Sequence, residues 1–364
     1  MKVLKKLKQY LDNINYTILI KAIAGNDFYS KPWKKVEHFR LGKLPIDKKE
    51  VIKLFYLGES IVNIRETVKD DLLIYDLLAE HLIIIEGEGY IFNHHRIIPY
   101  MGLYIIIDAI ENRIDNEYVW FGEDSIFLSN ILPYQIEGKV LDMCTGSGVQ
   151  ALILGSRGMH VKAIDLNPKA VATARQNIIM NNLEDKIEVL EGNLFEVLGD
   201  ETFDLIVSNP PFLPMLSNTN NIYYYADGGE DGLNIIRIIV EESNKYLSQN
   251  GKMMIIGGGF GDEIGPFYRS ELYKLTIQNK WYTTLILIGQ NDAKSELKRL
   301  SKSLHELNKE VEKIMTNLGA DSLKYYSFIL TIDKSFFVDG VEINDCSVSW
   351  REYMNELRKN NRIL

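Results

Sequence analysis

The chain has 364 residues, of which 46% are hydrophobic and 25% charged, a balance typical of a globular protein with room for two domains. Its net charge of −9 arises beyond residue 112, because residues 1–112 carry 16 Lys and Arg against 15 Asp and Glu and the remainder carries 25 against 35. This acidic body disfavours a broad phosphate-binding surface, although a local basic patch could still hold nucleic acid.

The sequence indicates neither a membrane span nor a secreted protein. No apolar run approaches the roughly 18 residues that a membrane-spanning helix needs. The first 14 residues place apolar side chains at helical spacing and lack the apolar core of a signal peptide. With only Cys144 and Cys346, the chain offers no disulfide framework and no multi-cysteine metal site. We therefore expect a cytoplasmic protein without a metal ion.

Residues 1–112 predict a mainly helical domain that ends in a hairpin. Apolar periodicity over 47–58 and 70–81 indicates helices, and two apolar runs flank the turn "EGEG" within 82–93. Helices followed by a hairpin are typical of a winged-helix-like domain. Such domains often bind nucleic acid, but the near-zero charge of this one favours a structural module or one that docks a substrate or partner. The pair His94–His95 has no neighbouring cluster of metal-binding residues.

Residues 113–364 predict a second domain of the α/β class. Short apolar strands alternate with helices, which indicates a parallel sheet covered on both faces. The expected strands are 139–144, 161–165, 186–193, 203–209, 252–259, 283–289 and 325–333.

A helical insertion is expected at about 292–318, where apolar residues follow a heptad spacing for about three repeats. The residues of this stripe are Leu297, Leu300, Leu304, Leu307, Val311, Ile314 and Leu318. The stripe fits a helix packed on its own domain, and it also fits a homodimer contact through residues 297–318.

A glycine-containing turn follows the first strand of this domain in "LDMCTGSGVQA". Gly146 and Gly148 allow the backbone to approach a ligand, and Asp165 ends the next strand, where a carboxylate can accept from ribose hydroxyls. Asp142, just before the turn, can orient it or accept from a cationic ligand group. Because Ala151 stands where a dinucleotide motif has its third glycine, and no basic cradle is evident, a nucleoside without phosphate fits better. S-adenosylmethionine is such a ligand.

The segment "SNPPF" ends the fourth strand. The Asn209 side-chain oxygen and the Pro210 carbonyl can each accept an N–H hydrogen, and Pro210 and Pro211 make the loop stiff. Phe212 can stack on a planar group. The segment can therefore be a rigid turn alone, or it can hold a flat nitrogen group for reaction at the carboxyl ends of the strands.

These segments are similar, in order and spacing, to class I S-adenosylmethionine-dependent methyltransferases with an asparagine–proline–proline–aromatic motif. "LDMCTGSG" and "ADGGEDGL" resemble the protein-glutamine methyltransferases that modify release factors and a ribosomal protein, over about residues 119–260. Cys144 replaces a family glycine, a substitution also present within that group. The resemblance implies a Rossmann-like, mostly parallel sheet of seven strands with S-adenosylmethionine as the cofactor.

The resemblance also implies a set of site residues. The expected cofactor contacts are Phe121, Asp124, Asp142, Cys144, Thr145, Gly146, Gly148, Asp165, Leu166, Asn193, Leu194 and Asn209. The expected substrate contacts are Asn209, Pro210, Pro211, Phe212, Tyr225 and Glu230. Asn209, Pro210 and Phe212 are the expected catalytic residues.

The resulting hypothesis is an N-methyltransferase that acts on a planar nitrogen, in the first place a protein glutamine amide. Two other acceptors stay open: a small molecule or peptide of specialised metabolism, and the exocyclic amine of a nucleobase in rRNA or tRNA. A cofactor-binding regulator that holds DNA through its winged-helix-like part is a further alternative.

Overall fold

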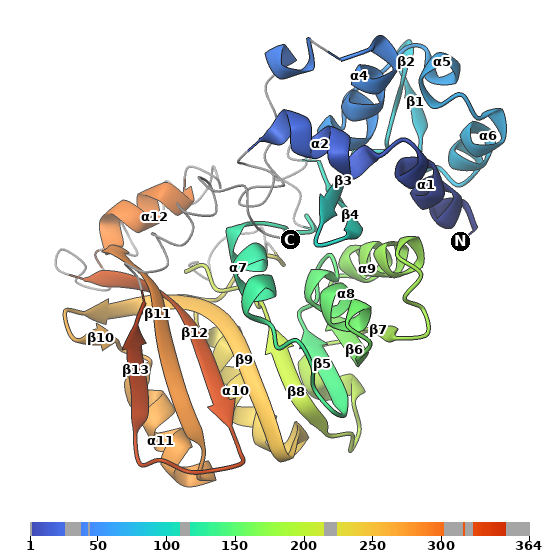
Figure 1. Cartoon of the computed structure of the whole chain (residues 1–364). Helices are drawn as coiled ribbons and strands as arrows, with labels where there is room; N and C mark the ends of the chain where they lie inside the picture. The colour runs from blue at the N-terminus through green and yellow to red at the C-terminus, as the bar shows by residue number, and fades with distance from the viewer. Residues whose placement is uncertain are drawn as a thin grey trace.

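The computed structural model describes residues 2–25, 38–42, 44–109, 117–214, 224–301, 316 and 323–346. The expected domain boundary at residue 112 lies outside these residues, so the division stays a prediction. Figure 1 shows the blue and cyan helical part above the green-to-red part that holds the main sheet.

The N-terminal part is a group of short helices followed by two hairpins. The amphipathic helix expected at the start is confirmed, because α1 buries Val3, Leu4, Leu7 and Leu11. The helical elements are α1 (Lys2–Asn13), α2 (Tyr16–Ala24), the 3-10 helix η1 (His38–Leu41), α4 (Ile46–Ile52), the π-helical turn η2 (Lys53–Leu57), α5 (Ile64–Val68) and α6 (Asp71–Ala79).

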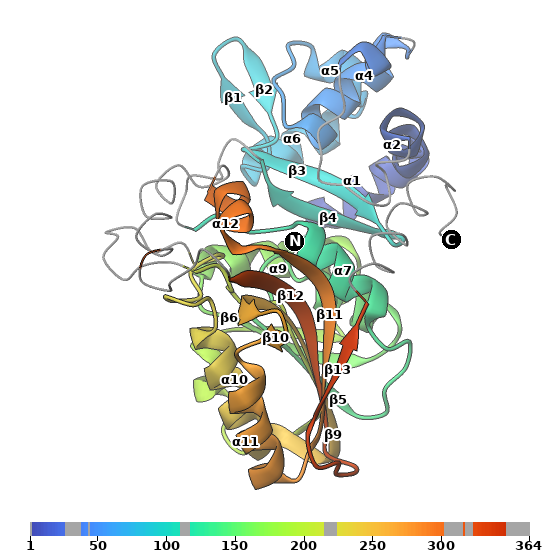
Figure 2. The same cartoon turned by 90° about the vertical axis from the view of Figure 1, so that its left-hand side faces the viewer.

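The hairpin expected at "EGEG" is confirmed as β1 (Ile84–Glu86) paired with β2 (Gly89–Ile91). A second hairpin, β3 (His95–Tyr100) with β4 (Leu103–Asp108), was not expected. Every residue of β4 is buried, so its apolar run lacks the alternation that identifies a half-exposed strand. Figure 2 shows this hairpin between the helices of the N-terminal part and α9.

The main sheet is mostly parallel, as expected for the α/β class. Its strand order is β13-β11-β12-β9-β8-β5-β6-β7. The strands are β5 (Lys139–Met143), β6 (His160–Asp165), β7 (Ile187–Glu191), β8 (Phe203–Ser208), β9 (Leu247–Asp262), β11 (Tyr282–Asp292), β12 (Lys324–Asp333) and β13 (Val341–Asp345).

Within the described residues the sheet has nine strands, not the seven expected. The two-residue strand β10 (Gly265–Pro266) folds back on β9, and β13 pairs in parallel with β11 at the outer edge. Both additions are short or exposed, so neither has the apolar run on which the sequence prediction depended.

Alternate side chains of each central strand enter two different cores. Leu205 and Val207 of β8 pack in the core that includes α7 (Glu123–Ile131), α8 (Val149–Ser156) and α9 (Pro168–Met180). Ile206 packs in the opposite core with α10 (Asn234–Tyr246) and α11 (Arg269–Asn279). Figure 2 shows α10 and α11 together on one side of the sheet.

The helices of the N-terminal part pack in the same core as α7, α8 and α9. Leu7 of α1 and Phe55 of η2 belong to the same buried cluster as Val140 of β5 and Ile178 of α9. The two parts of the chain therefore pack against each other through apolar side chains.

Of the expected insertion, the structure describes α12 (Ala293–Ser301) and the single residue Thr316. The side chains of the heptad stripe lie outside them, so the homodimer contact stays a prediction.

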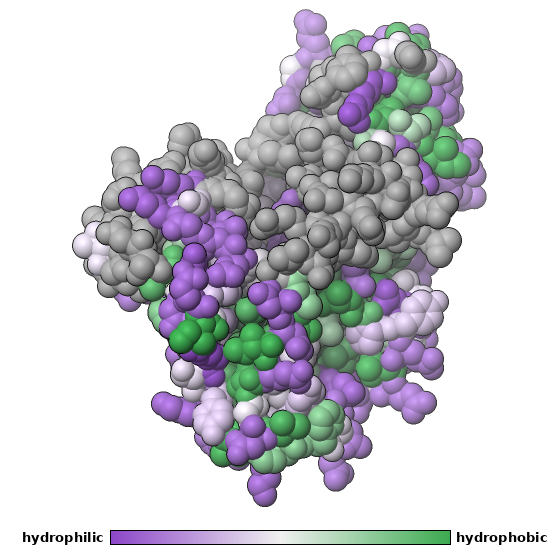
Figure 3. Space-filling model, turned by 60° about the vertical axis from the view of Figure 1, so that its left-hand side comes forward, coloured by the Kyte–Doolittle hydropathy of each residue, from purple (hydrophilic) through white to green (hydrophobic). Residues whose placement is uncertain are grey.

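None of the described helices combines the length and the hydropathy needed to cross a bilayer. On the face shown in Figure 3, apolar and polar side chains of the described residues lie in small mixed groups. Scattered exposed apolar side chains of this kind are normal for a folded protein and do not by themselves indicate a docking face.

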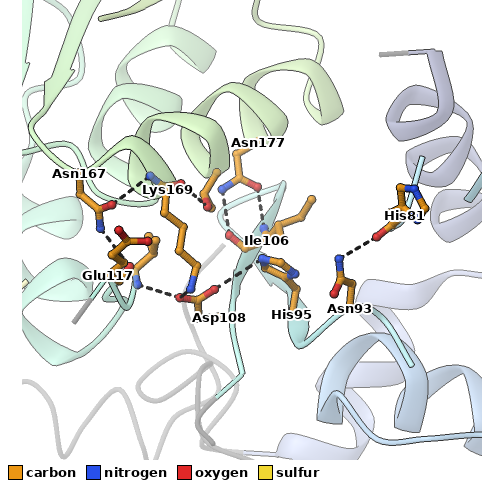
Figure 4. Close-up of polar contacts among 11 residues, drawn as sticks. His81, Asn93, His95, Ile106, Asp108, Glu117, Asn167, Lys169 and Asn177 are labelled. Atoms are coloured by element: carbon orange, nitrogen blue, oxygen red, sulfur yellow. Dashed lines mark hydrogen bonds and ion pairs between the residues drawn. The ribbon is translucent and has the colours of Figure 1, made fainter. Parts of the chain in front are cut away.

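A buried carboxylate joins the two parts of the chain. Asp108 at the end of β4 receives the Lys169 ammonium of α9 at 2.9 Å and the Val119 N–H at 2.9 Å. His95 Nε2 lies 3.5 Å from the other carboxylate oxygen, as Figure 4 shows. Burial lowers the pKa of His95, although the charge of Asp108 acts to raise it.

We predict that Asp108→Ala lowers the free energy of unfolding by about 3 kcal/mol, because it leaves Lys169 without its buried partner. Urea unfolding followed by circular dichroism measures the change. Lys6→Ala removes the exposed pair with Asp76 and should leave the unfolding midpoint nearly unchanged. Equal losses in both variants would contradict a structural role for the buried carboxylate.

Candidate functional site

The predicted cofactor turn connects β5 to α8. Gly148 immediately precedes α8 with a φ of 81°, and a Cβ there would lie 3.2 Å from the Ala174 side chain of α9. Glycine thus permits both the left-handed backbone and the close approach of α9. Cys144 also has a positive φ, of 59°, at the position where the resembled family has glycine.

Asp165 lies beside this turn, as predicted from its place at the end of β6. Its Oδ2 accepts from the Gly146 N–H at 2.7 Å, and its Oδ1 accepts from the Asn167 N–H at 2.9 Å. Burial raises the pKa of Asp165, whereas these backbone hydrogen bonds lower it. Leu166, the next residue, is 51% exposed and can therefore contact a ligand.

Asp142 supports the turn from inside. Its Oδ2 accepts from Thr145 Oγ1 at 2.5 Å and from the Ala151 N–H at 3.1 Å. Its Oδ1 is buried and has no hydrogen-bond partner among the described residues. Burial raises the pKa of Asp142 to about 7, with a further contribution from the charge of Asp165. Asp142 therefore has an oxygen available for a ligand donor.

Asn193 and Leu194 follow β7 at the same edge of the sheet. The Gly192 N–H donates to the Asp165 carbonyl at 3.0 Å, which fixes this turn beside Asp165. Asn193 Nδ2 donates to Glu196 Oε1 at 2.8 Å, and Leu194 begins the 3-10 helix η4 (Leu194–Val197). The expected contact of these two residues with the cofactor stays a prediction.

Asn209 follows β8, next to β5. Its Nδ2 donates to Asp124 Oδ2 at 2.8 Å and to Ser125 Oγ at 3.3 Å. Its Oδ1 is buried without a hydrogen-bond partner among the residues described. The amide is thus oriented by its nitrogen, and its oxygen is left to accept.

The segment before β5 places a carboxylate beside Asn209. The two carboxylate oxygens of Asp124 accept from Asn209 and, at 2.7 Å, from Trp120 Nε1, and the expected contact of Asp124 with the cofactor stays a prediction. Burial raises the pKa of Asp124, and these side-chain hydrogen bonds lower it. Phe121 was also expected at the cofactor. It lies in the hydrophobic core, with its ring edge-on to Tyr100 at 6.0 Å, and its contact with the cofactor stays a prediction.

The glycine-rich segment 228–232 packs directly on the Asn-Pro-Pro-Phe loop. The Leu213 N–H donates to the Ala226 carbonyl at 2.9 Å, and the Gly228 N–H donates to the Leu213 carbonyl at 3.0 Å. A Cβ at Gly232 would lie 2.4 Å from the Phe212 carbonyl oxygen. The backbone of the glycine-rich segment is therefore in direct contact with the backbone of the Asn-Pro-Pro-Phe loop. Pro210 is buried, and Pro211 and Phe212 are half-buried.

Three aromatic rings meet beside this loop. Trp120 and Tyr225 are stacked, with ring centroids 5.9 Å apart and planes 7° apart, and Tyr118 stands edge-on to both. Tyr225 was predicted for the site, whereas Tyr118 and Trp120 were missed. The run "YVWF" at 118–121 was the available signal. Glu230, also predicted, is exposed in the turn before α10, and no described contact joins it to Asn209.

The region that contains the glycine turn and the Asn-Pro-Pro-Phe loop is similar to known methyltransferases. Residues 121–261 match the family model described as methyltransferase small domain. A ribosomal protein uL3 glutamine methyltransferase of Francisella tularensis is 33% identical over 126 residues, which are 32% of this chain and 40% of the relative.

Two release factor glutamine methyltransferases are also similar. That of Geobacter sulfurreducens is 36% identical over 143 residues, or 36% of this chain and 50% of the relative. That of Thermodesulfovibrio yellowstonii is 29% identical over 271 residues, or 71% of this chain and 86% of the relative.

The chain spans between 36% and 40% of the length of the first relatives that it matches. The matched region contains the glycine turn, Asp165 and the Asn-Pro-Pro-Phe loop. Residues 121–261, which lie in and around the mostly parallel sheet, are therefore similar to a methyltransferase small domain.

Proposed function

We propose that this protein methylates a planar nitrogen, in the first place the side-chain amide of a glutamine in a protein. The observation that carries the proposal is the Asn209 amide, whose nitrogen is held by Asp124 and Ser125 while its buried oxygen has no partner among the described residues. A buried acceptor left open is costly unless a ligand satisfies it.

The residues around the glycine turn fit S-adenosylmethionine. The free, buried Oδ1 of Asp142 suits a cationic donor such as the ammonium of the cofactor, and Asp165 suits the ribose hydroxyls. The residues proposed to hold the cofactor are Asp142, Cys144, Thr145, Gly146, Gly148, Asp165, Leu166, Asn193 and Leu194. When bound, the cofactor supplies an electrophilic methyl group on a sulfonium.

The catalytic loop acts by positioning. Asn209 Oδ1 accepts one N–H of the substrate amide and the Pro210 carbonyl accepts the other, so the amide nitrogen is presented in one orientation. Phe212 stacks on the flat amide. Both acceptors are fixed before the substrate arrives, because Asp124 orients Asn209 and the prolines restrict the loop.

A protein acceptor is favoured over the alternatives by the names of the relatives, which specify glutamine in ribosomal protein uL3 and in release factors. The acidic body weighs against a large RNA acceptor. We place this reaction in the cytoplasm and assign docking of the protein acceptor to the N-terminal part. If the methyl group is found on a small molecule, a peptide or a nucleobase, that acceptor replaces the protein glutamine in this proposal.

We predict that the protein transfers a labelled methyl group from S-adenosylmethionine to purified uL3 or to a release factor. Mass spectrometry should locate one added methyl group on a glutamine side chain. In a cell extract, label that enters RNA or small molecules but no protein would overturn the proposed acceptor.

Asn209→Ala is expected to lower the turnover number about 100-fold or more, because one preorganised acceptor is lost. The affinity for S-adenosylmethionine, measured by calorimetry, should change by less than about threefold, since the Asn209 oxygen faces the acceptor. Loss of cofactor binding with the fold intact would show that this division of the site is wrong.

Asp124→Asn is expected to lower the turnover number about tenfold. The new amide has only one acceptor oxygen, so it cannot serve both Trp120 and Asn209, and Asn209 loses its fixed orientation. Glu123→Gln, which changes the exposed neighbour on the same helix, is the control and should stay close to wild type. Equal activity of Asp124→Asn and the control would contradict the positioning role.

Asp142 should make cofactor affinity depend on pH. Its pKa of about 7 means that it is partly protonated in the free protein, and a cationic partner favours the carboxylate. Affinity should therefore rise roughly fivefold to tenfold between about pH 6 and 7.5, with proton release on binding. Calorimetry in buffers of different ionisation enthalpy measures both. Asp142→Asn should bind more weakly and without this pH dependence, and an unchanged pH dependence would contradict the assignment.

A further inference from the structure

Asn177 of helix α9 and Asn181, which caps the C-terminus of α9, face the edge of β4 that does not pair with β3. Asn181 Oδ1 accepts from the Tyr104 N–H at 3.0 Å, and its Nδ2 donates to the Tyr104 carbonyl at 2.7 Å. Asn177 does the same to Ile106, accepting from its N–H at 2.6 Å and donating to its carbonyl at 3.0 Å. Each carboxamide thus occupies both hydrogen-bonding groups of one residue, as a neighbouring strand would.

The spacing of helix and strand makes this repeat possible. Asn177 and Asn181 are one turn apart, about 6 Å along the helix, and Tyr104 and Ile106 are two residues apart, about 6.8 Å along the strand. The matched steps let α9 and β4 run antiparallel with both pairs in register. At the start of α9, Lys169 adds a third contact with β4, this time with the side chain of Asp108. Figure 4 shows Asn177 and Lys169 on the same helix, facing β4.

The two asparagines differ in one contact. Asn177 Nδ2 also donates to the Ser147 carbonyl at 2.8 Å, in the middle of the cofactor turn between Gly146 and Gly148. The second bond of Asn181 Nδ2 goes to the Asn177 carbonyl in the last turn of α9, at 2.8 Å. Of the two side chains, Asn177 alone joins β4 to the cofactor turn.

The Asn177 side chain has little freedom to adjust. It is 0% exposed, and its oxygen and both amide hydrogens are engaged by Ile106 and Ser147. Rotation of the amide would place its oxygen against the Ile106 carbonyl. The backbone of β4 therefore fixes the orientation in which Asn177 holds Ser147.

We infer that Asn177 is a positioning residue through which the N-terminal part of the chain holds the cofactor turn in its binding conformation. The turn contains left-handed backbone at Cys144, Gly146 and Gly148, and such a segment loses conformational freedom when it is ordered. A turn that is already ordered binds a ligand without that entropic cost. The N-terminal part thus contributes to cofactor affinity, in addition to any docking of an acceptor.

Asn177→Ala and Asn181→Ala form a matched pair for the test. Each removes a carboxamide from β4, so both should lower the thermal unfolding midpoint by a similar amount. Calorimetry should show about tenfold weaker binding of S-adenosylmethionine to Asn177→Ala and less than about twofold weaker binding to Asn181→Ala. Hydrogen exchange of the amides at 145–148 should become faster in Asn177→Ala alone.

A purely structural role predicts a different result. The affinities of both variants would then fall together with their unfolding midpoints, and this outcome would overturn the inference, as would unchanged affinity in both. If Asn177→Ala does not fold, Asn177→Ser, whose hydroxyl replaces part of the amide, provides the same comparison with Asn181→Ser. These measurements need no methyl acceptor, so they are independent of the proposed glutamine substrate.

Discussion

The pairing of β5 with β8 is the constraint on which the site depends. Met143 lies opposite Ser208 in this parallel pair, and Ser208 Oγ donates to the Met143 carbonyl at 2.8 Å. The two strands therefore end side by side. The glycine turn leaves one end and the Asn-Pro-Pro-Phe loop leaves the other, so a ligand held by the first meets the second without further adjustment.

The loops beyond these strand ends are held mainly by one another. Gly232 passes against Phe212, and Tyr325 donates to the Phe212 carbonyl at 3.3 Å. On the other side, Asp124 connects Trp120 to Asn209. Flexible loops would have to be ordered by each substrate, whereas these loops are ordered by the fold, which is the condition for catalysis by positioning.

The sequence predicted the parts of the site that local chemistry determines. Asp165 ends β6, Asn209 directly follows β8, and Gly148 lies in the turn between β5 and α8. Such positions can be found from apolar runs and turn residues. The contact of Asp124 with Asn209 joins residues 85 positions apart, and no periodicity reports such a contact. The β3–β4 hairpin was missed because burial on both faces removes the alternation of a strand.

The common core of the N-terminal helices and α9 limits how this protein can be divided. In many modular enzymes a recruiting domain is attached by a linker and can be exchanged. Here α1 and β4 cover apolar and amide groups of the helix that also borders the cofactor turn. A different N-terminal part would leave those groups exposed unless the α9 face were rebuilt with it. The N-terminal helices and the helix that borders the glycine turn therefore cannot be exchanged independently of each other.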